Sequence, residues 1–233
     1  MNGNGDSGVT ALARDSVAEV EADRLVRSEA LADQAVPLTT QRQFRAQGHL
    51  RIEPLWSDGF AEAMADEART AFAGAAPPEV GPRTPVTAER TGLRRVPVAG
   101  GPVLLALHGA LTKLARTLSG QMLTPSFATY GYFERDDECI LHYDGEFSDL
   151  TLLIMALGQV APLRVHPELH GVTEDDLGRL ECDPEWDRGS GVAVAYPRLG
   201  LTAIRGRELP HHRPKGEVDG LAAVAALHYR SAF

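Results

Sequence analysis

The chain has 233 residues, of which 43% are hydrophobic and 24% charged, and its formal net charge is −9 at pH 7. That length accommodates one domain with a sizeable core. The acidic balance argues against a nucleic-acid partner, because phosphate binding depends on a basic surface. The first residues, MNGNGDSG, lack the basic and apolar regions of a signal peptide, and no apolar stretch approaches the roughly 20 residues that cross a bilayer. We therefore expect a cytoplasmic protein with no membrane partner.

The amino-terminal part differs in composition from the rest. Residues 1–38 are rich in Ala, Asp, Glu and Ser, so we expect a flexible or partly helical tail there, followed by one domain over 39–233. The tail contains a literal GxGxxG at 3–8. A dinucleotide-binding loop requires a strand before its first glycine, and only two residues precede Gly3. The two cysteines, Cys139 and Cys182, cannot build a structural zinc site by themselves.

Two helices are expected before a run of strands. After a short strand over 49–53, Ser57 is placed to cap a helix whose apolar residues recur every fourth position. A loop rich in Pro and Gly follows over 74–102. A second helix with one apolar face is then predicted by Leu104, Leu107, Leu111, Leu114 and Leu118.

The pattern after Gly120 is typical of strands separated by turns. We expect strands over 126–134, 139–145, 150–157, 160–166, 192–196, 201–205, 207–213 and 221–230. Helices followed by short strands indicate an α+β fold whose body is an antiparallel barrel or jelly roll.

The segment CILHYDG at 139–145 is the main candidate for chemistry. On a strand, His142 and Asp144 share a face, because alternate side chains point the same way. An imidazole and a carboxylate placed like this can bind one metal ion from adjacent corners. With one more histidine they form the two-histidine, one-carboxylate set of non-heme iron(II) oxygenases, which leaves coordination positions open.

A second candidate element carries adjacent histidines, His211 and His212. On a strand they face opposite sides, so only one of them can point into a barrel. The intervening chain is long enough for several strands that return this histidine to the side of His142. We expect one of the two to be the third ligand.

These elements together resemble a known family over about residues 42–233. The resemblance is carried by GHLRIEPL at 48–55, by Tyr130, Tyr132 and Phe133 at a strand end, by His142-x-Asp144, and by RGRELPHHRP at 205–214. In this order they resemble the 2-oxoglutarate/Fe(II)-dependent dioxygenases. The resemblance implies a double-stranded β-helix (jelly-roll or cupin-like) core, with the N-terminal helices packed on one side.

The resemblance also implies cofactors and residue roles. Fe(II) would be bound by His142, Asp144 and His211, which follows Pro210 and begins an HxR run. 2-Oxoglutarate and O₂ would be consumed while a small molecule is oxidised, with secondary metabolism as the expected setting. The family binds the far carboxylate of 2-oxoglutarate with a basic side chain, for which Arg230 is favoured here over Arg213 and Arg164.

Two alternatives remain open at this point. A cupin-like Fe(II) oxygenase without a keto-acid cosubstrate would need no carboxylate anchor. A non-catalytic jelly-roll binding domain would have the histidines and no redox role. In all cases we expect the segments 74–102 and 166–191 to cover the mouth of the pocket, because long loops tend to carry function.

Overall fold

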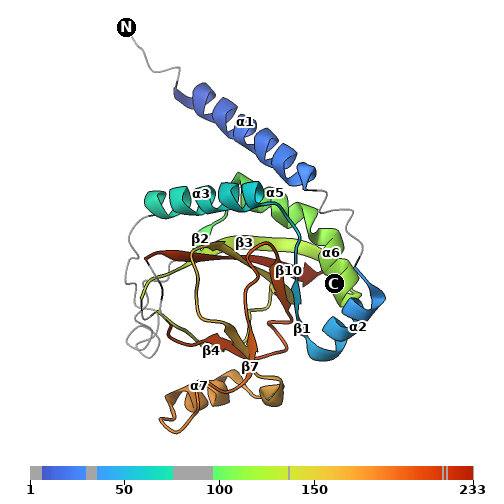
Figure 1. Ribbon diagram of the computed structural model, residues 1–233, viewed down its shortest axis with the longest axis vertical. Coiled ribbons are helices and arrows are strands. Elements are labelled where there is room, and N and C mark those ends of the chain that lie inside the picture. Colours follow the sequence, from blue (N-terminus) through green and yellow to red (C-terminus); the bar gives the residue numbers. More distant parts are fainter. Residues whose placement is uncertain are drawn as a thin grey trace.

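The computed structural model describes residues 7–29, 36–75, 97–135, 137–216, 218 and 220–232. A layer of helices covers one face of a six-stranded antiparallel sheet, and a four-stranded antiparallel sheet lies opposite its other face (Figure 1). The fold is therefore mixed α and antiparallel β, in agreement with the α+β class expected from the sequence.

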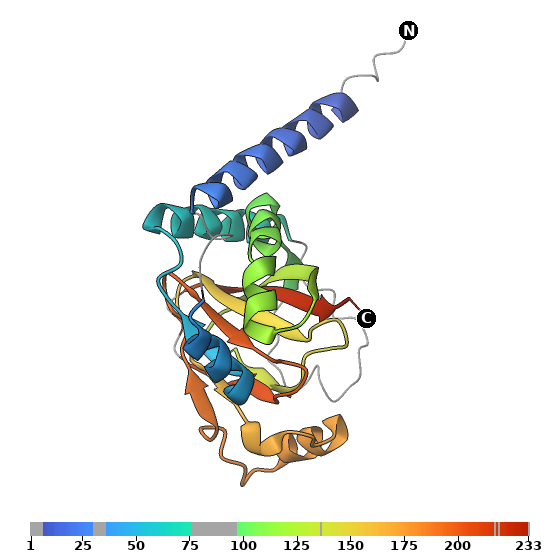
Figure 2. The same cartoon turned by 90° about the vertical axis from the view of Figure 1, so that its right-hand side faces the viewer.

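Most of the helices lie on one side of the molecule. Figure 2 shows α1, α3 and α5 above the strands, whereas α7 lies at the opposite end, beyond the four-stranded sheet. α1 packs against α5 and buries Ala22 and Val26. The helices are α1 (Ser7–Ser28), α2 (Leu38–Gln47), α3 (Asp58–Gly74), α5 (Pro102–Ala110), α6 (Thr112–Ser119), α7 (Glu174–Cys182) and the short 3₁₀ helix η2 (Pro167–Leu169).

The strands form two antiparallel sheets. The larger has the order β1-β8-β5-β10-β3-β2, and the smaller has the order β4-β9-β6-β7. The strands are β1 (His49–Ile52), β2 (Pro97–Ala99), β3 (Leu123–Phe133), β4 (Cys139–His142), β5 (Leu150–Leu157), β6 (Leu163–Val165), β7 (Val192–Val194), β8 (Leu201–Ile204), β9 (His211–Arg213) and β10 (Ala222–Ser231).

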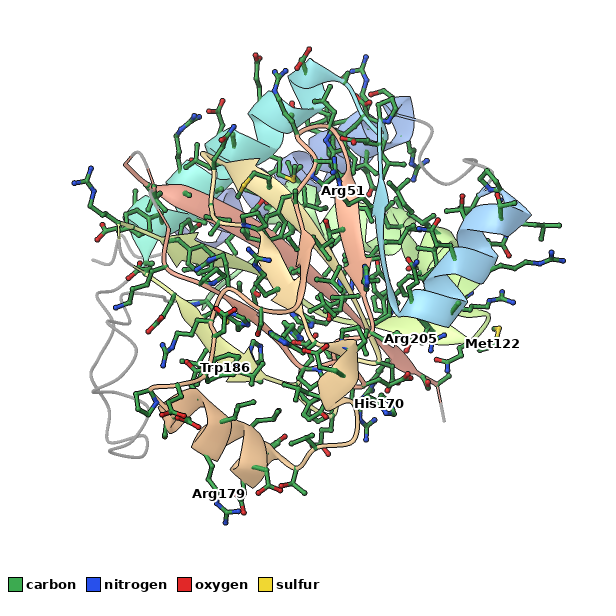
Figure 3. The ribbon with its side chains drawn as sticks, turned by 60° about the horizontal axis from the view of Figure 1, so that its bottom comes forward. Arg51, Met122, His170, Arg179, Trp186 and Arg205 are labelled. Atoms are coloured by element: carbon green, nitrogen blue, oxygen red, sulfur yellow. The ribbon has the colours of Figure 1, made fainter. Side chains whose placement is uncertain are left out.

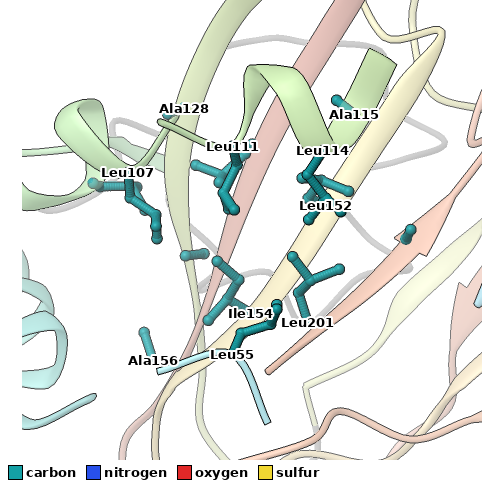
Figure 4. Close-up of a cluster of buried hydrophobic side chains, with 14 of the residues drawn as sticks. Leu55, Leu107, Leu111, Leu114, Ala115, Ala128, Leu152, Ile154, Ala156 and Leu201 are labelled. Carbon is teal, nitrogen blue, oxygen red and sulfur yellow. The ribbon is translucent and has the colours of Figure 1, made fainter. Parts of the chain in front are cut away.

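The main core lies between the helices and the six-stranded sheet. The five leucines of the expected second helix are all buried there, and Figure 4 shows Leu107, Leu111 and Leu114 facing Leu152 and Ile154 of β5. Alternation along β5 sends its even-numbered residues to this core, while Thr151 and Leu153 line the space between the two sheets. The same strand therefore builds the core and one wall of a cavity.

One half-buried carboxylate joins the helical layer to the sheet. Glu67 on α3 accepts hydrogen bonds from the backbone amides of Val103 and Leu104, at 2.6 and 3.0 Å, and from the hydroxyl of Tyr130 on β3, at 2.8 Å. The amides belong to the first turn of α5, where amides lack partners within the helix. Glu67 thus fixes the start of α5 against the sheet.

Three expected segments differ in detail from the structure. The leucine-rich helix is divided into α5 and α6 at Leu111, whose ψ is 0°, although the apolar face runs through both. The expected loop 74–102 contains the edge strand β2, while its residues 76–96 lie outside the described part of the chain. The segment 166–191 contains η2 and α7.

Among the residues that the structure describes, none of the helices combines the length and the apolar composition that a membrane span requires.

Candidate metal centre

Three side chains meet where β4 and β9 pair. The Cα atoms of His142 and His211 are direct partners across these strands, and the two imidazole centroids are 4.4 Å apart. Asp144 lies two residues beyond His142. Its Oδ1 is 3.9 Å from Nε2 of His142 and 3.6 Å from Nε2 of His211. The structure thus brings together the three residues that the sequence predicted as ligands.

The backbone fixes which imidazole nitrogen faces the carboxylate. Nδ1 of His142 is 2.7 Å from the carbonyl oxygen of Ile140, and Nδ1 of His211 is 2.9 Å from that of Leu209. A carbonyl only accepts, so each Nδ1 carries the hydrogen. Each Nε2 is therefore the nitrogen that can offer its lone pair to a metal ion, in the orientation that outer hydrogen bonds give to metal-binding histidines.

The electrostatics favour an ionised carboxylate. Burial alone would raise the pKa of Asp144, but His211 and His142 hold it below its usual value. For His142, burial lowers the pKa. Cys139 and Asp144 outweigh this effect and raise the pKa of His142 to about 9. The sulfur of Cys139 is 3.8 Å from Nδ1 of His142. Without a metal ion, a proton on His142 balances the carboxylate, and a bound cation would take that proton's place.

The three side chains line a cavity between the two sheets. It has a volume of about 80 Å³ and passes from these ligand atoms to Arg213 at the end of β9. Small residues of the six-stranded sheet, Gly131 on β3 and Ala226 on β10, leave room on its floor. Two imidazole nitrogens and one carboxylate oxygen are a donor set for Fe(II), Ni(II) or Zn(II), and one that leaves positions open suits non-heme iron(II) chemistry.

Comparison with known proteins places this geometry in a wider context. No protein-family model matches the chain, and no curated protein matches it. Solved structures do match. The non-heme alpha-ketoglutarate-dependent carbocyclase SnoK, from nogalamycin biosynthesis, aligns at 16% identity with a TM-score of 0.66, over 87% of this chain and 86% of SnoK.

Two further matching structures were solved with 2-oxoglutarate bound. HygX from Streptomyces hygroscopicus, solved with nickel and 2-oxoglutarate bound, aligns at 15% identity with a TM-score of 0.62, over 85% of this chain and 88% of HygX. EctD from S. alaskensis, solved with 2-oxoglutarate and 5-hydroxyectoine, aligns at 20% identity with a TM-score of 0.60, over 84% and 76% of the two chains. The chain has the fold of these 2-oxoglutarate-dependent enzymes. The structural resemblance expected from the sequence is thereby confirmed.

The three arginines considered for the cosubstrate of such an enzyme lie in different places. Arg213 is buried, lines the cavity, and has its guanidinium carbon 3.1 Å from the ring centroid of Phe133. Arg164 pairs with His212 across β6 and β9 and points to the other face of that sheet, where it donates to the carbonyl of Gly191. Arg230 is exposed outside the cavity.

The two adjacent histidines face opposite sides of β9, as alternation requires. His211 lines the cavity, whereas His212 lies on the other face. There its Nδ1 is 3.0 Å from Nε2 of His166, and its Nε2 is 2.9 Å from the carbonyl oxygen of Arg188. Burial lowers the pKa of His212 to about 4. Figure 3 labels Trp186 on this side of the molecule, where its ring packs against both His166 and His212.

Two cavity residues were not singled out from the sequence. Thr151 on β5 donates its hydroxyl hydrogen to Asp144, and His228 on β10 is its partner across the strands. His228 also lines the cavity. A signal for Thr151 was present, because it is the one polar residue in the apolar strand 150–157. For His228, the sequence pattern that indicates a cavity is the run of small residues that precedes it on the same face of β10.

Proposed function

We propose that this protein is an Fe(II)- and 2-oxoglutarate-dependent oxygenase that oxidises a small molecule. One observation carries the proposal. Nε2 of His142, Nε2 of His211 and Oδ1 of Asp144 converge on one point, in a cavity between the two sheets of a fold shared with 2-oxoglutarate-dependent enzymes. Two imidazoles and one carboxylate on one side of a metal ion leave room for a cosubstrate and O₂.

In this proposal the chain itself positions and shields. His142, Asp144 and His211 would hold Fe(II), which with 2-oxoglutarate and O₂ supplies the oxidising chemistry and yields succinate and CO₂. The carbonyls of Ile140 and Leu209 keep the ring orientation of the two histidines. Apolar cavity residues such as Leu153 and Val224 exclude water from the space beside them.

The residue proposed to bind the far carboxylate of 2-oxoglutarate is Arg213. It lies two residues after His211 on β9, so both side chains point into the cavity. A buried guanidinium favours a carboxylate because it forms charge-assisted, paired hydrogen bonds. Arg230, favoured from the sequence, lies outside the cavity, with its guanidinium 5.7 Å from the ring of Phe147.

The proposed architecture of the core is a double-stranded β-helix. Its support is the pair of facing antiparallel sheets with strand orders β1-β8-β5-β10-β3-β2 and β4-β9-β6-β7. In each sheet, strands distant in sequence lie side by side, such as β3 with β10 and β4 with β9. Such a core encloses its site between two sheets, which agrees with the position of the cavity.

The substrate is proposed to be a small molecule that approaches beside His228. The ring of His228 stacks on Phe127 at 4.1 Å, and Phe127 and Phe147 are 43% and 47% exposed, so apolar rings are accessible at this end. SnoK, which shares this fold, comes from nogalamycin biosynthesis. We accordingly keep secondary metabolism as the proposed setting.

The proposal is tested by metal content and by cosubstrate turnover. Protein purified without oxygen should bind one equivalent of iron, and with Fe(II), O₂ and a panel of metabolites it should convert 2-oxoglutarate to succinate. His142→Ala, Asp144→Ala and His211→Ala should each lose both properties. His170→Ala, which alters an exposed histidine, should retain them.

Other outcomes point to other classes of protein. Iron binding and O₂ consumption without any need for 2-oxoglutarate would favour the cupin-like oxygenase. A wild-type protein that binds no iron would favour a non-catalytic binding domain and contradict the proposal.

A further inference from the structure

The two oxygens of Asp144 have different surroundings. Oδ1 faces Nε2 of both His142 and His211. Oδ2 points away from them and accepts a hydrogen bond of 2.5 Å from Oγ1 of Thr151. The carboxylate is 12% exposed, so water has little access to replace that bond. Oδ1 is therefore the oxygen that lies nearest to the two imidazole nitrogens.

Thr151 is itself held in place from the neighbouring strand. It is 2% exposed, and its Oγ1 is 3.2 Å from Nδ1 of His228, which also hydrogen-bonds with Oγ of Ser148. A carboxylate without its proton can only accept, so the single hydroxyl hydrogen of Thr151 goes to Asp144. The oxygen of Thr151 can then only accept from His228. The direction of the hydrogen bond to Asp144 is thus determined.

A glycine closes the other side of the carboxylate. The carbonyl oxygen of Gly206 accepts a hydrogen bond of 2.9 Å from the amide of Asp144. A methyl group on the Cα of Gly206 would overlap both Oδ2 and Cγ of Asp144. The φ angle of Gly206 is not in the left-handed region, so space for the carboxylate is the reason that the position needs glycine.

We propose that Thr151 and Gly206 are positioning residues that make Asp144 a ligand through one oxygen only. This inference rests on the proposed function of His142, Asp144 and His211 as ligands. The hydroxyl of Thr151 hydrogen-bonds to Oδ2, and the absence of a side chain at Gly206 leaves space for the carboxylate. A carboxylate that binds through one oxygen uses one coordination position and leaves more of them for the cosubstrate and O₂.

The test measures metal affinity rather than turnover. Co²⁺ is the probe, because it resists oxidation in air, and its dissociation constant is measured by calorimetry. Thr151→Val keeps the shape and removes the hydroxyl, so its affinity should fall at least about 10-fold, the lower end for loss of an outer-shell partner. Thr151→Ser retains the hydroxyl and should stay close to wild type.

A matched control removes a hydroxyl elsewhere in the same sheet. Thr202 on β8 is fully buried and donates to the carbonyl of Ala195 at 3.1 Å. Thr202→Val should leave Co²⁺ affinity unchanged, although it costs a comparable buried hydrogen bond. For the glycine, Gly206→Ala should lose Co²⁺ binding, and Gly109→Ala on α5, where an added methyl meets no atom within 4 Å, should keep it.

The outcomes are separable. Equal Co²⁺ affinity in Thr151→Val and Thr202→Val, with both folded by circular dichroism, would overturn the role of Thr151. If Thr151→Val does not fold, Gly206→Ala and Thr151→Ser decide the matter, and wild-type affinity in Gly206→Ala contradicts the positioning of Asp144. Should His142→Ala bind Co²⁺ as tightly as wild type, the metal centre itself is wrong, and the failure belongs to the proposed function.

Discussion

At the scale of single residues, the three ligands predicted from the sequence lie together in the structure, whereas the arginine favoured as anchor lies outside the cavity. The alternation rule that singled out His142 and Asp144 needs no tertiary information, but β4 ends at His142 and Asp144 lies just after the strand. Alternation along β10 also puts Arg230 on the face of Val224, Ala226 and His228, which line the cavity. Alternation gives the face of a strand but not where the cavity ends. The cavity ends before Arg230, which pairs with Thr124 near the end of β3.

The anchor can be tested by a pair of arginine variants. Arg213→Ala should raise the KM for 2-oxoglutarate roughly 10- to 100-fold, because a charged hydrogen-bond pair contributes about 1.5–3 kcal/mol. The KM for the primary substrate should change much less. Arg230→Ala, which alters an exposed side chain, is the control and should behave as wild type. The assignment is wrong if the Arg230 variant, and not the Arg213 variant, loses affinity for 2-oxoglutarate.

At the scale of elements, one histidine joins the helical layer to the strand that carries His228. Nε2 of His108 on α5 is 2.8 Å from the carbonyl oxygen of His228, and the hydroxyl of Tyr229 donates to the carbonyl of His108 at 2.8 Å. The two rings also make an edge contact at 4.7 Å. α5 and β10 are therefore connected by reciprocal hydrogen bonds directly behind the cavity wall.

This connection predicts a pH dependence of stability. Burial lowers the pKa of His108 below its ordinary value of 6.5, against the opposing effect of the His228 carbonyl. Below pH 6.5, His108 binds a proton in the unfolded chain but stays neutral in the folded chain until the pH reaches its lower folded pKa. The free energy of unfolding should therefore fall as the pH drops from 6.5 towards the lower folded pKa. His108→Gln cannot titrate and should show a smaller fall in urea unfolding between pH 7 and pH 5. An unchanged slope would show that His108 contributes nothing.

At the scale of the whole molecule, local sequence patterns predict which helices and strands form, whereas tertiary contacts determine the residues at which they begin and end. The strands from 123 onward and the apolar leucine face follow from period-2 and period-3.6 patterns, which act within one element. The edge strand β2 depends on pairing with β3, a partner about 30 residues away, and carries too few residues for its own pattern. The roles of Thr151 and Gly206 likewise depend on tertiary contacts. Their contacts with Asp144 exist only once β4, β5 and β8 are assembled.

The metal site should couple to the stability of this assembly. His142 and His211 lie on adjacent strands of one sheet. Asp144 contacts Thr151 on β5 and Gly206 just after β8, and both of these strands belong to the other sheet. A metal ion that binds only the folded chain at 100 times its Kd adds about 2.7 kcal/mol to the free energy of unfolding. For a domain of this size each kcal/mol raises Tm by about 2–4 °C, so saturating Ni²⁺ should raise it by roughly 5–10 °C.

Thermal unfolding followed by circular dichroism measures this shift. His142→Ala should show little of it, while His170→Ala should show all of it. An equal rise in the His142 variant would mean that Ni²⁺ stabilises the chain from another site, because removal of one of three ligands cannot leave the affinity of this centre intact.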